Sequence, residues 1–166
     1  MAFWIIIALS MLFIIGPILM MRPSPRERRL ARIRQVAQQH GVDIQVMFLS
    51  RNELYAATLE RNPHLGDYDW ARYQKIAAEN QSGPSVKGKW VQRRTSEGKL
   101  VWEAQDIRQV PVPAVDAILA RWHAAQLPDF LALELGPRSA SLVWNEKGDV
   151  AEAEAVCQQL QELLAV

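Results

Sequence analysis

The stretch Met1-Ala-Phe-Trp-Ile-Ile-Ile-Ala-Leu-Ser-Met-Leu-Phe-Ile-Ile-Gly-Pro-Ile-Leu-Met-Met21 opens the chain and sets how the rest of it is interpreted. It carries no charged side chain. At about 1.5 Å rise per residue, a helix over its twenty apolar residues matches the ~30 Å hydrocarbon core of a bilayer. The sequence therefore predicts a transmembrane helix over residues 1–21, kinked near Pro17. No positive n-region or small-residue cleavage site favours a cleaved signal peptide instead.

A run of arginines follows this stretch and predicts its orientation. Six arginines stand against one glutamate, Glu27, between residues 22 and 34, a net charge of +5. By the positive-inside rule, the protein is expected in the bacterial inner (cytoplasmic) membrane as a single-pass protein, with its N-terminus outside and its C-terminal domain cytoplasmic. The arginines are either topology determinants on a helix that packs against the domain, or membrane-surface residues that contact anionic lipid headgroups: Arg22, Arg26, Arg28, Arg29, Arg32 and Arg34.

The basic segment has clear helix boundaries. Ser24, Pro25 and Glu27 occupy the N-cap, N1 and N3 positions of a capping box, and Gly41 suits the left-handed position that ends a helix. These signals predict a helix from about Pro25 to His40. The chain is thus divided into an anchor over residues 1–21, a basic juxtamembrane helix over 22–41 and a cytoplasmic domain over 42–166.

The layout of one apolar span followed by Met-Arg22-Pro23-Ser-Pro-Arg26-Glu-Arg28-Arg29 resembles the YajC family, the single-span accessory subunit of the bacterial preprotein translocase. The resemblance covers about thirty-five residues. It implies a non-catalytic accessory role beside the translocase. The chain also looks like the broader set of single-span inner-membrane proteins of proteobacteria.

The remaining sequence predicts an α+β domain with a largely antiparallel sheet of five or six strands and about four helices. The pattern over Trp70 to Ala77 fits either a helical face or a strand, and strand is preferred. A capping box at Ser50 predicts a helix that ends at Asn62. A helix is expected after Pro113, with an inward face of Val115, Ile118, Leu119 and Trp122. A capping box of Asp149 with Glu152 predicts a final helix whose inward residues are Val156, Leu160, Leu163 and Leu164. Strands are expected over 42–49, 87–94, 99–104, 130–135 and 139–144.

The hairpin over residues 87–104 is the candidate interaction site. Trp90, Arg93, Arg94 and Trp102 form a possible partner interface, because tryptophan and arginine are enriched at protein interfaces. The alternatives are that Trp90 and Trp102 are core residues, or that the hairpin is simply solvated or faces the membrane. A nucleic-acid surface is disfavoured because residues 35–166 carry thirteen basic against seventeen acidic residues. No nucleic-acid partner is expected.

No motif predicts catalysis, a cofactor or a metal. Phosphate-binding loops, dinucleotide fingerprints and zinc-protease motifs are absent from the sequence. His64, Asp67 and Asp69 lie close together, but a solvated loop explains them better than a metal site does. Cys157 neighbours an apolar helical stripe and is interpreted as a core residue.

The sequence therefore predicts a non-catalytic, single-span membrane accessory or adaptor subunit that docks on a larger multi-span inner-membrane complex. The preprotein translocase is the named candidate for that complex. The alternative is a membrane-anchored enzyme at the cytoplasmic face, or a module that binds nucleic acid or lipid, with a site that no motif reveals.

Overall fold

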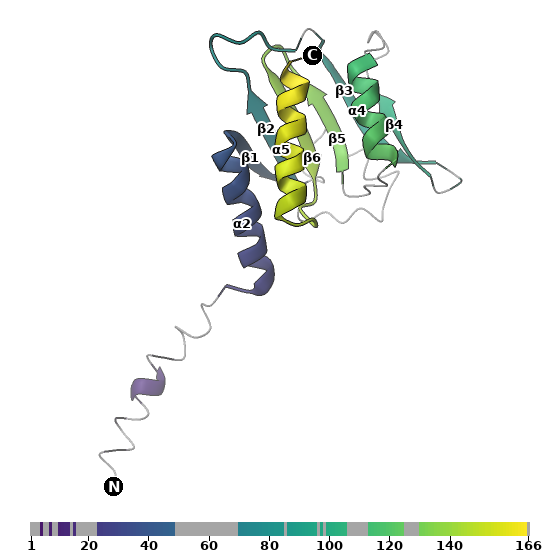
Figure 1. Cartoon of the computed structure of the whole chain (residues 1–166). Coiled ribbons are helices and arrows are strands. Elements are labelled where there is room, and N and C mark those ends of the chain that lie inside the picture. Colours follow the sequence, from purple (N-terminus) through teal and green to yellow (C-terminus); the bar gives the residue numbers. More distant parts are fainter. Residues whose placement is uncertain are drawn as a thin grey trace.

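The computed structural model describes residues 4, 7, 10–13, 15, 23–48, 70–84, 86–95, 97, 99–105, 113–124 and 130–165. Their centre is one six-stranded antiparallel sheet with the strand order β1-β2-β6-β5-β3-β4 (Figure 1). The predicted α+β class and antiparallel sheet are confirmed. The strands are β1 Val42–Met47, β2 Trp70–Ile76, β3 Gly88–Arg94, β4 Leu100–Ala104, β5 Phe130–Leu135 and β6 Ser139–Trp144.

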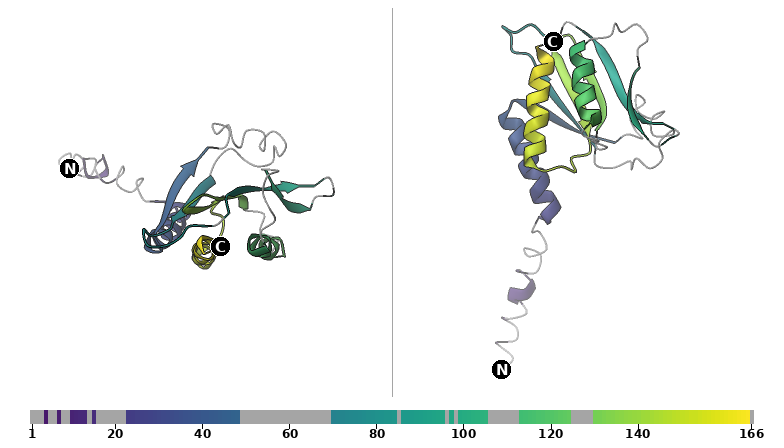
Figure 2. Two further views of the ribbon diagram at one scale, coloured as in Figure 1. Left: turned by 90° about the horizontal axis from the view of Figure 1, so that it is seen from above. Right: turned by 45° about the vertical axis from the view of Figure 1, so that its right-hand side comes forward.

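Three helices lie along one face of the sheet: α2 Pro25–Gln39, α4 Pro113–Ala124 and α5 Val150–Leu164 (Figure 2). Predicted capping boxes are present at Ser24 with Glu27 and at Asp149 with Glu152, and the one predicted at Ser50 lies outside the described residues. Gly41 has φ +69°, as the predicted end of α2 requires. Local sequence signals therefore placed these helix boundaries to within one or two residues.

The main core fills the space between the helices and the sheet. A row of aromatic rings crosses it from β4 to β2, with centroid separations of 5.6 Å for Trp102–Trp122, 5.1 Å for Trp122–Phe130, 6.0 Å for Phe130–Trp144 and 5.4 Å for Tyr73–Trp144. Such tilted and edge-on pairs add about 0.5–1.5 kcal/mol each beyond area burial. The row joins the two ends of the helical layer.

The other sheet face carries a second buried cluster that includes Met47, Trp70, Val91 and Val143. β1 shows the alternation of faces expected of a strand: Val42 and Ile44 pack in the main core, and Met47 is buried in the opposite cluster. Val46 is 51% exposed, so the main core does not extend to that end of β1.

The prediction of a transmembrane helix is wrong by this structure. Within the part of the chain that the structure describes, no helix combines the length and the apolar character needed to cross a membrane. The longest described helices, α2 and α5, have fifteen residues each. Their length of about 22 Å falls short of the ~30 Å core, and α2 is rich in arginine. The single-pass inner-membrane location and its N-outside orientation lose their support with the span.

Other predictions are confirmed or fall outside the described residues. Trp70–Ile76 is a strand, which settles the helix-or-strand alternative. The faces of α4 and α5 are buried as predicted, and Cys157 lies in the core. The helix predicted after Ser50 and the loop with His64, Asp67 and Asp69 lie outside the described residues.

Candidate functional site: a tryptophan-lined groove at the sheet edge

A groove with a volume of about 370 Å³ lies between the β3–β4 hairpin and α4. Its strand side is formed by Trp90, Val101, Trp102 and Ala104, and its helix side by Asp116, Leu119 and Ala120. Figure 1 shows α4 lying over this hairpin. Neighbouring residues of a strand point to opposite faces, so a groove lined by both Val101 and Trp102 includes the strand backbone itself. The groove therefore reaches the outer edge of β4.

No other described strand pairs with that edge. β4 is the terminal strand of the sheet and pairs only with β3 among the described strands. Hydrogen bonds from Thr95 N to Lys99 O and from Gln105 N to Lys89 O bracket the hairpin. Because paired and unpaired residues alternate in an antiparallel ladder, Val101 and Glu103 bond to β3. The backbone N–H and C=O groups of Trp102 and Ala104 therefore point away from the sheet.

Trp102 belongs to both the groove and the core. Its ring contacts Trp122, and its Nε1 is buried with no hydrogen-bond partner in the structure. Leaving a buried donor unpaired costs about 1–3 kcal/mol. The second tryptophan of the groove, Trp90, is 6% exposed. The groove is thus a shallow aromatic site built on a rigid hairpin and not on a loop.

Asp116 supplies the charge of the groove. It lies in the first turn of α4, where a carboxylate interacts favourably with the helix dipole. It is exposed, and no ion pair links it to another described residue. Among the described residues that line the groove, Asp116 is the charged one.

The opposite end of the helical layer holds a closed polar cluster around Glu146, which is 1% exposed. Arg34 Nε and Nη2 donate to its two carboxylate oxygens at 2.9 and 2.6 Å, and Tyr73 Oη donates to Oε1 at 2.7 Å. Arg29 donates to the backbone carbonyls of Lys147 and Glu146 at 2.7 and 3.4 Å. We call Arg29, Arg34, Tyr73 and Glu146 the α2 latch, because they join α2 to β2 and to the β6–α5 loop.

The burial and hydrogen bonding of the α2 latch indicate a structural role. Glu146 has φ +54°, a left-handed conformation that costs a non-glycine residue about 1–2 kcal/mol. Burial, reinforced by the negative charge of Glu146, raises the pKa of Tyr73 well above its usual range. Both carboxylate oxygens are occupied and shielded from solvent, so Glu146 cannot meet a substrate as a general acid or base.

A third polar cluster lies on the sheet face opposite the helices. Glu134 accepts from Arg72 Nη2 at 2.9 Å and lies 3.4 Å from Lys89 Nζ. All three side chains are only 17–22% exposed. Desolvation lowers the pKa of Lys89. This pairing reduces the free positive charge of the hairpin on which a nucleic-acid surface would depend.

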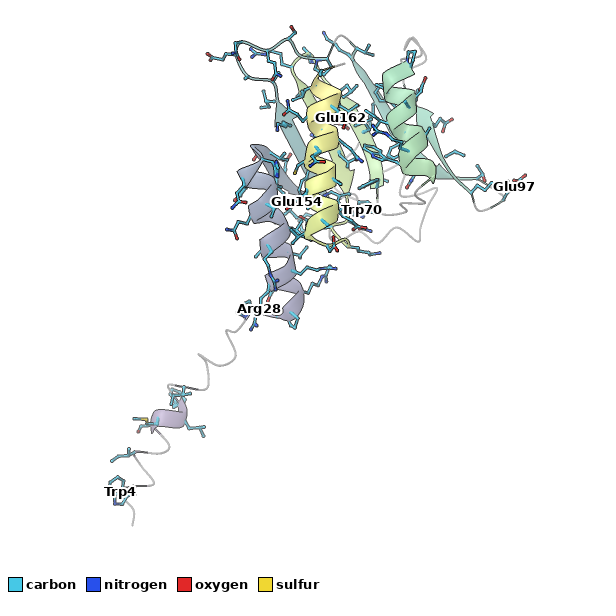
Figure 3. The ribbon with its side chains drawn as sticks, viewed as in Figure 1. Trp4, Arg28, Trp70, Glu97, Glu154 and Glu162 are labelled. Carbon is cyan, nitrogen blue, oxygen red and sulfur yellow. The ribbon has the colours of Figure 1, made fainter. Side chains whose placement is uncertain are left out.

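The structure separates the six arginines that the sequence grouped together. Arg29 and Arg34 belong to the α2 latch. Arg26, Arg28 and Arg32 are exposed on α2, and Arg28 Nε donates to the carbonyl of Pro23 at 3.0 Å (Figure 3 labels Arg28 near the start of the helix). Arg22 lies outside the described residues. The alternative in which this helix packs against the domain is thus observed for two of the six, and lipid contact stays a prediction.

The predicted partner interface is brought together only in part. Trp90 and Trp102 line the same groove. Arg93 and Arg94 belong to β3, and their side chains lie outside the described part of the chain. Sequence reasoning missed Val101, Asp116 and Glu146. The sequence does place Asp116 in the first turn of a helix that begins at Pro113. No local pattern indicates that this turn faces the hairpin.

The described residues offer neither a metal site nor an activated cysteine. No group of three or more His, Cys, Asp or Glu side chains within them is placed to hold a metal ion. Burial raises the pKa of the Cys157 thiol, which disfavours the thiolate that a nucleophile needs.

Comparisons of the chain with family models, with curated proteins and with solved structures gave no match.

Proposed function

We propose that this protein is a non-catalytic adaptor whose β4 edge binds an extended segment of a partner protein. The observation that carries the proposal is the meeting of the tryptophan-lined groove with the outward-facing backbone of Trp102 and Ala104. In strand addition, backbone hydrogen bonds supply affinity and side-chain pockets supply specificity. Both features occur here on one five-residue strand.

The energetics favour a polypeptide over a small substrate. A segment paired with β4 satisfies its own backbone groups while one alternate side chain enters the groove, so a shallow site suffices. A catalytic pocket instead needs acid, base or nucleophile groups within hydrogen-bond reach of one another. Of the described residues that line the groove, Asp116 alone is titratable.

The identity of the partner stays a prediction. The resemblance to YajC around Arg22-Pro23 names the preprotein translocase as the first complex to examine, and no comparison bears on it.

Site-specific photocrosslinking tests the proposal in the organism that makes the protein. A photoreactive residue at Val101, which is 37% exposed beside the groove, is expected to give a discrete adduct with one polypeptide. The same residue at Glu154, an exposed position on α5 labelled in Figure 3, serves as the control and is expected to give none.

Proline at position 104 sharpens the test. Ala104→Pro removes an outward N–H and leaves the β3 pairs of Val101 and Glu103 intact, so the fold should persist because proline is tolerated at strand edges. The Val101 adduct should disappear, while Ala104→Val should keep it. If Ala104→Pro lacks a cooperative melt, Ala104→Lys, which fills the groove, replaces it. An adduct that survives every blocking variant that folds would refute strand addition at β4.

A further inference from the structure

We propose that the side chain entering the groove is basic, an arginine or a lysine of the partner segment. This inference rests on the proposed function, since it names the chemistry of the segment that pairs with β4. Three features of the groove lead to it: its charge, its apolar walls and its aromatic rings.

The charge of the groove is uncompensated. Asp116 lines it, no basic residue is among the described residues that line it, and Asp116 has no ion-pair partner among the described residues. Covering a carboxylate with an apolar side chain removes water from it and supplies nothing in return. An acidic side chain would add repulsion between like charges. A cation is the occupant that satisfies Asp116.

The walls suit a long stem that ends in a cationic head. Val101, Ala104, Leu119 and Ala120 give the groove apolar surface beside Asp116. Arginine and lysine bury their methylene stems against such surface while the charged head stays at a polar group. A compact charged group without a stem would leave this surface unused.

The rings add a second attraction for a cation. Trp90 and Trp102 line the groove, and tryptophan is the aromatic side chain that binds cations most strongly through its face. Such contacts contribute about 0.5–1 kcal/mol at exposed sites and more when desolvated. Asp116 and the tryptophans therefore act on the same cationic head from opposite walls.

Three capped peptides test the inference with the full-length protein. Acetyl-Thr-Val-Xaa-Val-Thr-amide is prepared with arginine, norleucine or glutamate at the central position, and binding is followed by tryptophan fluorescence and isothermal titration. The arginine peptide is expected to bind about fivefold more tightly than the norleucine peptide at low salt, and the glutamate peptide most weakly. The preference should shrink as salt is raised, because the Asp116 contact is partly exposed.

Matched variants distinguish the effect of the Asp116 charge on binding from the effect of strand pairing at the groove. Asp116→Asn should weaken the arginine peptide about fivefold and leave the norleucine peptide nearly unchanged. Glu154→Gln makes the same change of charge on α5 and should alter neither. Equal binding of the arginine and norleucine peptides, with both abolished by Ala104→Pro, would overturn the basic side chain and keep strand addition. Binding of no peptide at millimolar concentration, or binding that Ala104→Pro leaves unchanged, would overturn both proposals.

Discussion

The two ends of the helical layer differ in whether their polar groups are paired with one another. At the α2 end, Arg34, Tyr73 and Glu146 satisfy one another in a buried cluster. At the α4 end, Trp102 Nε1 has no partner and Asp116 lies in an open groove without an ion pair to any described residue. The same core of aromatic rings connects the two ends.

The difference separates a cluster that serves stability from a groove whose carboxylate is left for a ligand. A buried ion pair is costly to break, because removal of one partner leaves the other charge without compensation. An exposed carboxylate adds little to folding, and a buried donor without a partner costs stability. Substitutions at the α2 latch should therefore lower stability strongly, while substitutions at the groove should act mainly on binding.

The largest effect is expected for Glu146→Ala. The change leaves Arg34 and the Tyr73 hydroxyl without their acceptor, and the free energy of unfolding should fall by about 3–5 kcal/mol. Urea denaturation measures this loss. Glu154→Ala, on the exposed side of α5, is the control and should change the free energy by less than about 0.5 kcal/mol. A loss at Glu146 as small as the control would mean that the α2 latch contributes nothing to the fold.

A smaller effect with a pH signature is expected for Tyr73→Phe. Loss of a hydrogen bond to a charged group should cost about 1.5–3 kcal/mol at neutral pH. The folded pKa of Tyr73 is raised, so its phenol stays protonated in the folded state at a pH where the unfolded chain ionises. Its contribution is fully present below the unfolded pKa of about 10 and is lost as pH rises above that value.

Unfolding measured in urea from pH 8 to pH 11 tests this sign. The wild-type protein should lose stability above about pH 10, and Tyr73→Phe should lose less over the same range. Lys89, whose pKa is lowered by burial, works in the opposite direction in both proteins and cancels in the comparison. Identical slopes for the two proteins would show that Tyr73 ionises as freely in the folded state as in the unfolded one.

The sequence predicted what depends on neighbouring residues. The capping boxes at Ser24 and Asp149 are formed by residues three positions apart, and both were predicted correctly. The α2 latch joins Arg34 to Glu146 across 112 residues, and no local pattern indicates that pairing. The groove likewise depends on how α4 packs over a hairpin, so the sequence named Trp90 and Trp102 but missed Asp116.

Composition and periodicity fall short at two places. Val46 lies on the same strand face as Val42 but is 51% exposed, so a strand pattern does not decide which of its positions are covered. The apolar composition of residues 1–21 predicted a span that the described helices do not supply. Composition and periodicity describe what a segment is able to bury. The remaining structure decides where that burial occurs.

The smallest effect is expected at the groove and is tested with a matched pair of tryptophans. Trp122 is 2% exposed and its Nε1 donates to Gln159 Oε1, so Trp122→Phe removes both packing and a satisfied hydrogen bond. We expect a loss of about 1.5–3 kcal/mol.

Trp102→Phe also shortens a ring in contact with the core, but it removes a buried donor that has no partner. Relief of that cost offsets part of the lost packing, so the free energy of unfolding should fall by less than about 1 kcal/mol. Urea denaturation of the two variants measures the difference. Equal losses would mean that the Trp102 indole is as fully satisfied as that of Trp122.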